Sequence, residues 1–326
     1  MTRPTGAGES LALGAGPEFD RIRKIIEGLG AEGAGLGDDC GLLPTEDGFL
    51  ALSTDISVER IHFRLDWIGF VDVGWRATAA ALSDLAAEGA DPLGVLCALA
   101  MPARAPESQL LEVMTGVGAA AKAAGARVLG GDLSSGPVWS LAVTVVGRAP
   151  RPIPRSGAEP GDRLWVTGTL GGSRAALQAW RRGDQPEPGS RTRYAHPDPR
   201  IGAGRWLAGR GAHAMIDLSD GLAGDAGHVA AASGVALELD LNALPVAPEV
   251  NAEAVRLGLT PQQFAAEGGE DFELLVALAP GFNAAAEFTR DCGIPLTPIG
   301  AVQEGSGVRF LPDGTEVRLS GFNHFG

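Results

Sequence analysis

Acidic residues are frequent in one short part of this 326-residue chain. Asp38 and Asp39 are adjacent, and Asp55 and Glu59 follow them among short apolar runs within residues 36–63. The run FLALS at residues 49–53 is typical of a β-strand, so we expect Thr54 and Asp55 at the end of a strand, where their orientation is fixed. Carboxylates held close together repel one another unless cations share them. This stretch therefore predicts a site for Mg²⁺.

More aspartates occur elsewhere in the chain, each after a strand, a glycine pair or a Leu-Ser pair. The additional candidates are Asp84, Asp132, Asp217 and Asp220, and hydroxyl groups accompany the acidic residues at Ser53, Thr54 and Ser219. Such hard oxygen ligands suit Mg²⁺, which combines a few carboxylates with water and substrate phosphates. Aspartates are also common at turns and helix caps, where they accept backbone N–H groups. That alternative suits any one of these residues better than it suits the whole set.

The first half of the chain alternates between predicted strands and predicted helices. We expect helices at residues 19–29, 73–88 and about 106–124, and strands at 95–101, from 127 to Asp132, and at 139–148. Asp84 falls inside a helix, where aspartate is mildly unfavourable and needs a reason. A proline-rich run at 150–154 interrupts the pattern. Because the chain exceeds the size of one core, we predict two domains, residues 1–150 and 151–326.

The second half contains the same mixture of elements. We expect strands at residues 163–167, 235–241 and 272–278. We also expect one helix that runs through Trp180, one that ends at Ser233, one that begins at Thr260 and one near residues 282–292. Residues 183–199 are polar and proline-rich, which indicates a surface excursion. The glycine-rich turn at 168–173 precedes a helix, so its backbone amides are an alternative phosphate site, although most such turns bind nothing.

The charge and the lysine content exclude several classes of function. The formal net charge is −14, whereas proteins that bind nucleic acid or anionic membranes rely on clustered lysine and arginine. The only lysines are Lys24 and Lys122, and neither follows a glycine-rich loop, so the chain has no Walker-type phosphate loop. If the protein uses a nucleotide, divalent cations must neutralise its phosphates.

Cysteine and histidine patterns exclude further classes. The three cysteines are too far apart in sequence for a CxxC pair and are odd in number, which suits a reducing compartment. No HExxH zinc motif and no GxSxG nucleophile turn occurs. The N-terminus has no signal-peptide run, and no stretch is apolar enough for a membrane span. We therefore expect a cytoplasmic protein.

Nine short motifs occur in order along the chain. They are Gly37-Asp38-Asp39, Ser53-Thr54-Asp55 with Glu59 and His62-Phe63, Leu82-Ser83-Asp84-Leu85-Ala86, Gly130-Gly131-Asp132, Arg155-Ser156-Gly157-Ala158, Thr167-Gly168-Thr169-Leu170-Gly171, Asp217-Leu218-Ser219-Asp220-Gly221-Leu222, Gly268-Gly269-Glu270-Asp271 and Gly321-Phe322-Asn323-His324-Phe325. Each motif alone is weak, but the series covers about residues 18–326 and is highly specific. Together these motifs resemble the thiamine-monophosphate kinase family.

The resemblance implies a fold, a reaction and a set of site residues. The fold is the two-domain α/β (α+β) architecture of aminoimidazole ribonucleotide synthetase, in which each domain is a mixed sheet with packed helices. The reaction is ATP-dependent phosphorylation of thiamine monophosphate to thiamine diphosphate, the last step in making that cofactor, by a homodimer. The N-terminal domain would bind ATP and Mg²⁺ and form the dimer, and the C-terminal domain would complete the substrate site.

The implied ligands divide into three groups. Several Mg²⁺ ions would be held by Asp39, Ser53, Thr54, Asp55, Asp84, Asp132, Asp217 and Asp220. ATP would contact Gly131, Asp132, Arg155 and Ser219. Thiamine monophosphate would contact His62, Glu270 and Phe322. Three places depart from the family pattern, namely Arg60 where glycine is common, Tyr194-Ala195-His196-Pro197, and Asn323 where an acidic residue is usual.

The chemistry of the acceptor fits the absence of an obvious general base. A phosphate monoester has a second pKa near 6 and is mostly dianionic at neutral pH, so no base is needed to create the nucleophile. We expect direct in-line transfer without a phosphoenzyme. The alternatives are another ATP-using member of the superfamily, such as a formylglycinamidine or aminoimidazole ribonucleotide synthetase or a hydrogenase-maturation dehydratase, and a non-catalytic ion-binding or nucleotide-binding protein.

Overall fold

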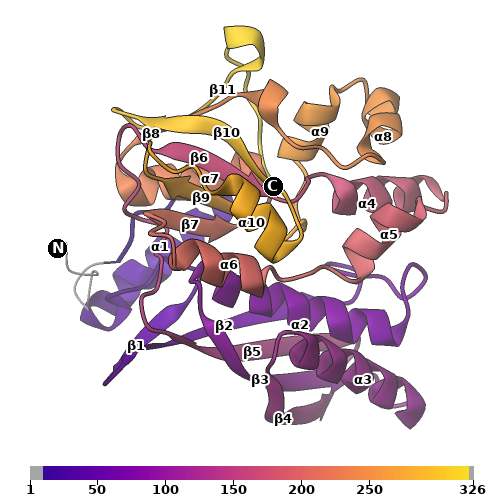
Figure 1. Ribbon diagram of the computed structural model, residues 1–326. Helices are drawn as coiled ribbons and strands as arrows, with labels where there is room; N and C mark the ends of the chain where they lie inside the picture. The colour runs from indigo at the N-terminus through magenta and orange to yellow at the C-terminus, as the bar shows by residue number, and fades with distance from the viewer. Residues whose placement is uncertain (1–9, 323–326) are drawn as a thin grey trace.

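Two mixed β-sheets flanked by helices make up the protein, which is represented by a computed structural model. The structure describes residues 10–322. Figure 1 shows the first sheet in the lower part of the view and the second above it, with α2 (Phe70–Ala87) lying between them. Within the described residues, no helix combines the length and the apolar composition needed to cross a bilayer.

The first sheet and its helices are formed by the N-terminal half. In spatial order, its strands are β1 (Gly41–Thr45), β2 (Gly48–Val58), β5 (Ser140–Ala149), β3 (Asp91–Met101) and β4 (Arg127–Ser135). β3 and β4 are parallel and the other neighbours are antiparallel. The helices of this half are α1 (Pro17–Leu29), α2 and α3 (Glu107–Ala123).

Alternation of side chains along the strands gives the first sheet one covered face. Leu141, Val143 and Val145 of β5 point inward and belong to the same buried cluster as apolar residues of α2 and α3. These two helices pack closely because Gly74 and Gly116 lack side chains. A Cβ at Gly74 would lie 2.0 Å from the carbonyl oxygen of Val113.

The opposite face of the first sheet carries exposed apolar side chains from several strands. They are Leu43, Ile56, Leu96 and Leu129. β4 lies at the edge of the sheet, and each of its nine residues is exposed. We call this surface the open face. Contiguous apolar surface of this kind commonly marks a protein interface.

The second sheet is covered on both faces. In spatial order, its strands are β11 (Gly307–Phe310), β8 (Ala236–Leu239), β10 (Leu296–Gln303), β6 (Arg163–Thr167), β9 (Leu274–Leu278) and β7 (Ala214–Asp217). The helices of this half are α4 (Gly172–Arg182), α5 (Pro188–Ala195), α6 (Ile201–Ala208), α7 (Leu222–Ser233), α8 (Val250–Leu257), α9 (Pro261–Ala266) and α10 (Ala285–Cys292). Short 3₁₀ helices occur at Gly30–Gly33, Leu241–Ala243 and Pro312–Gly314.

Two buried clusters cover the two faces of this sheet. Met215 and Val276 on one face belong to a cluster with Leu207 of α6 and Phe288 of α10. Residues of the same strands on the other face, such as Ile216, belong to a cluster with α7. Burial of both faces explains why β9 reads as a continuous apolar run.

Most predicted elements are confirmed, with three corrections. β2 continues to Val58, so Thr54 and Asp55 lie within the strand and not at its end. β4 continues to Ser135, so Asp132 also lies inside a strand. Residues 183–199 contain helix α5, whose Tyr194 is buried, and are not merely a surface excursion. The division of function between residues 1–150 and 151–326 stays a prediction.

Candidate active site

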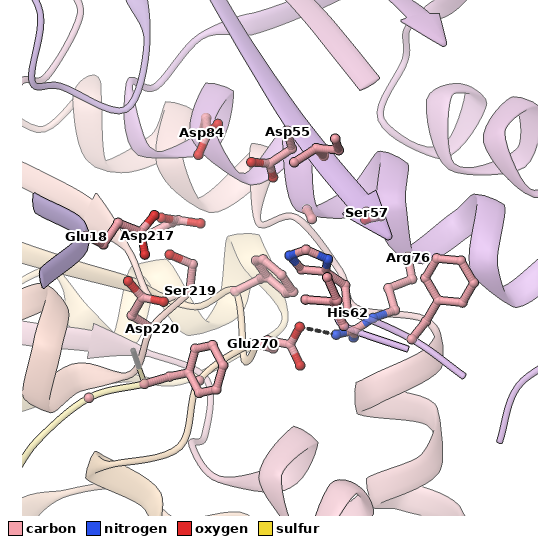
Figure 2. Close-up of a pocket in the computed structure, with 18 of the residues that line it drawn as sticks. Glu18, Asp55, Ser57, His62, Arg76, Asp84, Asp217, Ser219, Asp220 and Glu270 are labelled. Atoms are coloured by element: carbon pink, nitrogen blue, oxygen red, sulfur yellow. Dashed lines mark ion pairs between the residues drawn. The ribbon is translucent and has the colours of Figure 1, made fainter. Parts of the chain in front are cut away.

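One large cavity, of about 1140 Å³, receives side chains from both halves of the chain. Figure 2 shows two groups in it: aspartates from α2, β2 and the end of β7, and a second group formed by His62, Arg76 and Glu270. We call these the acidic end and the acceptor end. The predicted convergence of acidic side chains from distant segments on a common cavity is therefore confirmed for several of them.

Three carboxylates form the tightest part of the acidic end. Asp39 precedes β1, Asp84 projects from α2, and Asp217 is the last residue of β7. One oxygen from each lies within 4.8 Å of the others. Three convergent carboxylate oxygens, drawn from a loop, a helix and a strand, have the composition and spacing of a divalent cation site.

The electrostatics of this end also favour a cation. Burial, followed by the charge of nearby Asp39, raises the pKa of Asp217 to about 8. Burial and Asp39 likewise raise the pKa of Asp55 to about 6 and that of Asp38 to about 7. Burial, then the charges of Asp55 and Asp217, raise the pKa of Asp84 well above its usual value. Without a cation, these groups keep protons that a bound metal would displace.

Other polar groups hold the carboxylates in place. The Ser53 hydroxyl donates to Asp84 Oδ2. Arg155, in the linker between the two sheets, donates from Nη2 to Asp39 Oδ1 at 2.6 Å and from its backbone N–H to Asp38 Oδ1 at 3.1 Å. Arg155 thus lies at the acidic end, as its predicted role near ATP phosphates requires, but it already pairs with a candidate metal ligand.

The turn between β7 and α7 supplies Ser219 and Asp220, and both line the cavity. The backbone N–H of Asp220 donates to Asp225 Oδ2 at 3.2 Å. Asp225 is buried in the first turn of α7, and burial, followed by the charge of Asp220, raises its pKa well above the usual value. Sequence reasoning missed Asp225, because nothing in the sequence distinguishes it from an exposed acid in the first turn of a helix.

Thr54, Gly131 and Asp132 do not join the carboxylate cluster within one chain. Thr54 borders the cavity, but its side chain lies on the open face, where its hydroxyl oxygen is 2.8 Å from that of Thr144. Gly131 and Asp132 are exposed on β4 and do not line the cavity. β4 is three strands away from β2, or about 14 Å at the usual strand spacing.

The acceptor end contains the three residues predicted to contact thiamine monophosphate. His62, Glu270 and Phe322 all line the cavity. The ring Nδ1 of His62 accepts from the backbone N–H of Val58 at 3.0 Å, and the backbone N–H of Phe322 donates to the carbonyl oxygen of Asp220 at 2.9 Å. Phe322 is 52% exposed.

Two further residues of this end were not predicted from the sequence. Arg76 of α2 forms an ion pair with Glu270, and its guanidinium lies 3.8 Å from the centroid of the Tyr194 ring. Tyr194 belongs to the segment that departs from the family pattern. Nothing in the alanine-rich sequence around Arg76 distinguishes it from an arginine on a solvated helix face.

The glycine-rich turn before α4 does not serve as a phosphate site. The backbone N–H groups of Gly171 and Ser173 donate to the carboxylate of Asp271, at 2.6 and 3.3 Å. A side chain of the protein therefore occupies the amides that an anion would need. The alternative phosphate interpretation of residues 168–173 is wrong.

Two other departures from the family pattern have different outcomes. Arg60 adopts a φ of 69°, a left-handed conformation that favours glycine, so this loop keeps a glycine-like backbone at some cost in strain. Asn323 lies outside the described residues.

Comparison with known proteins identifies the family. The N-terminal domain of AIR synthase related proteins matches residues 37–149, and the corresponding C-terminal domain matches residues 159–311. The thiamine-monophosphate kinase of Mycobacterium tuberculosis is 37% identical over 329 residues, which cover 98% of this chain and 95% of the relative. That of Haemophilus influenzae is 36% identical over 326 residues, covering 94% and 98%.

Solved structures agree with the sequence relatives. A structure described as AaThiL complexed with AMPPCP and TMP has a TM-score of 0.85 and 32% identity, covering 100% of this chain and 99% of that one. The thiamine-monophosphate kinase of Stenotrophomonas maltophilia has a TM-score of 0.77 and 34% identity, covering 91% and 96%. The hydrogenase maturation protein HypE of E. coli, at 24% identity and a TM-score of 0.68, shares the fold. With its two-domain mixed-sheet architecture, the chain belongs to the thiamine-monophosphate kinase family of AIR synthase related proteins.

Proposed function

We propose that this protein transfers the γ-phosphoryl group of ATP to thiamine monophosphate, giving ADP and thiamine diphosphate, and so completes the synthesis of that cofactor. The observation that carries the proposal is the cavity in which carboxylates from three segments meet opposite His62 and Glu270. The likeness over the full chain to a structure described as holding AMPPCP and TMP supports it.

Magnesium is the metal that the acidic end fits best. Asp39, Asp84 and Asp217 offer three convergent oxygens, and Asp55 and Asp220 line the same end of the cavity. All are hard oxygen donors, which suits Mg²⁺ and not a softer metal. When bound, Mg²⁺ supplies neutralisation of the phosphate charges and brings donor and acceptor oxygens together.

The residues of the chain then have positioning roles and no proton-transfer role. The acceptor phosphate is already dianionic at neutral pH, so its oxygen attacks directly and ADP leaves without a covalent enzyme intermediate. Ser53 holds Asp84, and Arg155 holds Asp39 and lies where it would meet the nucleotide phosphates. Ser219, at the same end, would also face ATP.

Acceptor recognition would occur at the other end of the cavity. Glu270 would accept hydrogen bonds from the aminopyrimidine of thiamine monophosphate. His62 lines the same end of the cavity as Glu270. The Phe322 ring would stack on a ring of thiamine monophosphate, whose thiazolium is cationic and attracted to an aromatic face. These roles follow the family motifs that the sequence carries at these positions.

We also propose a homodimer formed through the open face, with a second copy of this chain as its occupant. The face presents apolar side chains from at least four strands, and β4 offers an unpaired edge. Gly131 and Asp132 lie on this strand, so their predicted role in binding ATP and Mg²⁺ requires that the dimer bring them to a partner's cavity. The predicted cytoplasmic location stays a prediction.

The dimer is tested with an apolar-to-charged substitution on β4. Leu129→Lys should convert the dimer to a monomer in sedimentation velocity, because a lysine at this position, where leucine is 54% exposed on the open face, would be desolvated in the interface. Val255→Lys on α8, at 74% exposure, is the matched control and should leave the dimer intact. A wild-type monomer at micromolar concentration would refute this proposal.

The reaction is tested by following phosphorus resonances with Mg-ATP and thiamine monophosphate. The expected result is a diphosphate signal that grows as ADP forms, and other phosphorylated acceptors in parallel incubations define specificity. Nucleotide binding without ADP formation would favour a non-catalytic binding protein. A phosphorylated residue after incubation with ATP alone would contradict direct transfer.

A further inference from the structure

Arg76 connects the acceptor end to helix α2. Its side chain is only 5% exposed and forms an ion pair with Glu270, shown by the dashed line in Figure 2. Its Nη1 donates to the carbonyl oxygen of Tyr194 at 2.5 Å. Since one face of the guanidinium also stacks on the Tyr194 ring, that face and the edge of the group are held, and Arg76 has little freedom to move.

Tyr194 extends this connection to the other acceptor residue. It is 2% exposed, and its hydroxyl donates to the carbonyl oxygen of His62 at 3.0 Å. Its ring also packs edge-on against Trp67 and Trp180. A continuous chain of contacts therefore runs from Glu270 through Arg76 and Tyr194 to His62.

The backbone of Glu270 needs such support. Its φ is 65°, and Phe272 has a φ of 51°, conformations that residues other than glycine rarely adopt. Strained backbone of this kind persists only where surrounding contacts determine it. The backbone N–H of Glu270 donates to the carbonyl oxygen of Ser219 at 2.7 Å, and the ion pair with Arg76 holds the Glu270 carboxylate.

Helix α2 relates the two ends of the cavity. It carries Asp84 at the acidic end and Arg76 at the acceptor end, eight residues apart, or about 12 Å along a helix axis. Because one rigid element carries both residues, the distance between the carboxylate cluster and Glu270 is fixed by the helix and not by loops.

We infer that Arg76 is a positioning residue for the acceptor. It holds the Glu270 carboxylate in place directly, and it holds the His62 segment through Tyr194. Both acceptor residues are thereby kept at a set distance from the acidic end. This inference rests on the proposed function in one respect, the assignment of Glu270 and His62 to acceptor binding. The side chain of Arg76 contacts Glu270 and Tyr194, neither of which belongs to the carboxylate cluster, so Arg76 should affect binding of the acceptor and not binding of ATP.

The test separates the KM for thiamine monophosphate from the KM for ATP. Arg76→Lys keeps the charge but loses the planar contacts, and it should raise the acceptor KM roughly tenfold, the lower range for losing a hydrogen bond to a charged group. Arg76→Met should raise it further. The KM for ATP should stay within about twofold, the size of effect expected between independent sites.

Two other variants identify the route of the effect. Tyr194→Phe removes only the hydroxyl that contacts His62 and should raise the acceptor KM less than Arg76→Lys does. In a Glu270→Gln background, Arg76→Lys should cause little additional loss, since residues acting through one another are non-additive. Additive losses in that double mutant would overturn the inference.

If the role of Arg76 were purely structural, its variants would change stability and not the acceptor KM. The control is Arg182→Met, which removes an ion pair with the buried Glu253 outside the cavity and should lower the melting temperature without changing either KM. Equal changes in both KM values for Arg76→Lys, or a lowered melting temperature alone, would refute the positioning role. If Arg76→Met does not fold, Arg76→Lys and Tyr194→Phe decide the question.

Failure of the inference is distinguishable from failure of the proposed function. A wild-type protein that forms thiamine diphosphate while Arg76→Lys keeps a normal acceptor KM would overturn only the inference. A wild-type protein that neither phosphorylates thiamine monophosphate nor binds it in calorimetry would overturn both.

Discussion

Replacing Asp84 by asparagine tests the central feature of the site, the three convergent carboxylates. Ligand oxygens of Asp39, Asp84 and Asp217 lie within 4.8 Å of one another, and at an effective dielectric constant of about 20 two unit charges that far apart repel by about 3.5 kcal/mol. Three ionised carboxylates therefore carry roughly 10 kcal/mol of mutual repulsion, of which Asp84→Asn removes two of the three pairs.

The substitution should have opposite effects on stability and on catalysis. The metal-free variant should melt at a higher temperature than the metal-free wild type at pH 8, because asparagine neither carries a buried charge nor has to take up a proton on folding. Its turnover should fall by at least about 100-fold, because a metal site contributes several kcal/mol of transition-state stabilisation. Helix α2 should keep its shape, since asparagine fills the same volume.

The assay measures ADP formation over a Mg²⁺ titration, together with thermal melting in EDTA. Asp47→Asn makes the same chemical change in the exposed turn between β1 and β2 and should change neither measurement. Unchanged turnover of Asp84→Asn at saturating Mg²⁺ would reject Asp84 as an essential ligand. A lower melting temperature in EDTA would show that the carboxylates do not repel in the folded state.

Three further outcomes follow from the same geometry. The pKa values of Asp38, Asp55 and Asp217 are raised from 3.8 to about 7, 6 and 8, so the folded protein holds protons that the unfolded chain releases above pH 4. The melting temperature in EDTA should therefore fall as the pH rises from about 4 to about 8, and Mg²⁺ should raise it more at pH 8 than at pH 5; a flat profile would contradict the raised pKa values. Ser53→Ala should weaken activity about tenfold at limiting Mg²⁺ and recover at high Mg²⁺, as for loss of a group that orients a ligand, whereas loss at every Mg²⁺ concentration would argue for a direct role. Asp271→Ala should lower the free energy of unfolding by about 1–3 kcal/mol in urea titration, because the amides before α4 lose their acceptor, and an unchanged midpoint would rule out that capping role.

Local patterns in the sequence predicted most elements correctly because they depend on nearest neighbours. Apolar spacing located α1, the residues at a helix start and the glycine after its end located α3, and Thr260 caps α9 as expected. The same reasoning ended β2 and β4 too early. Strand length is decided by pairing with neighbouring strands, and β5 supports β2 as far as Val58.

Residue type identified the candidates at the acidic end but not their arrangement. Asp39, Asp84 and Asp217 converge, whereas Asp132, an equally plausible ligand by sequence, lies on an exposed strand three strands from β2. Side chains alternate between the faces of a strand, so Ser53 points to Asp84 while Thr54 points to the open face. Sheet order and pleating decide this, and neither is encoded in a short motif.

The sequence by itself determined which chemical groups this protein offers. It has many hard oxygen ligands and no catalytic histidine, cysteine or lysine motif, and these properties depend only on residue types and their order. Only the tertiary structure decided which ligands meet and what holds the acceptor residues. Arg76 and Glu270 are 194 positions apart, and only the packing of α2 against the second half of the chain brings their charges together. Long-range pairing of this kind arises from burial of whole elements, which no local pattern specifies.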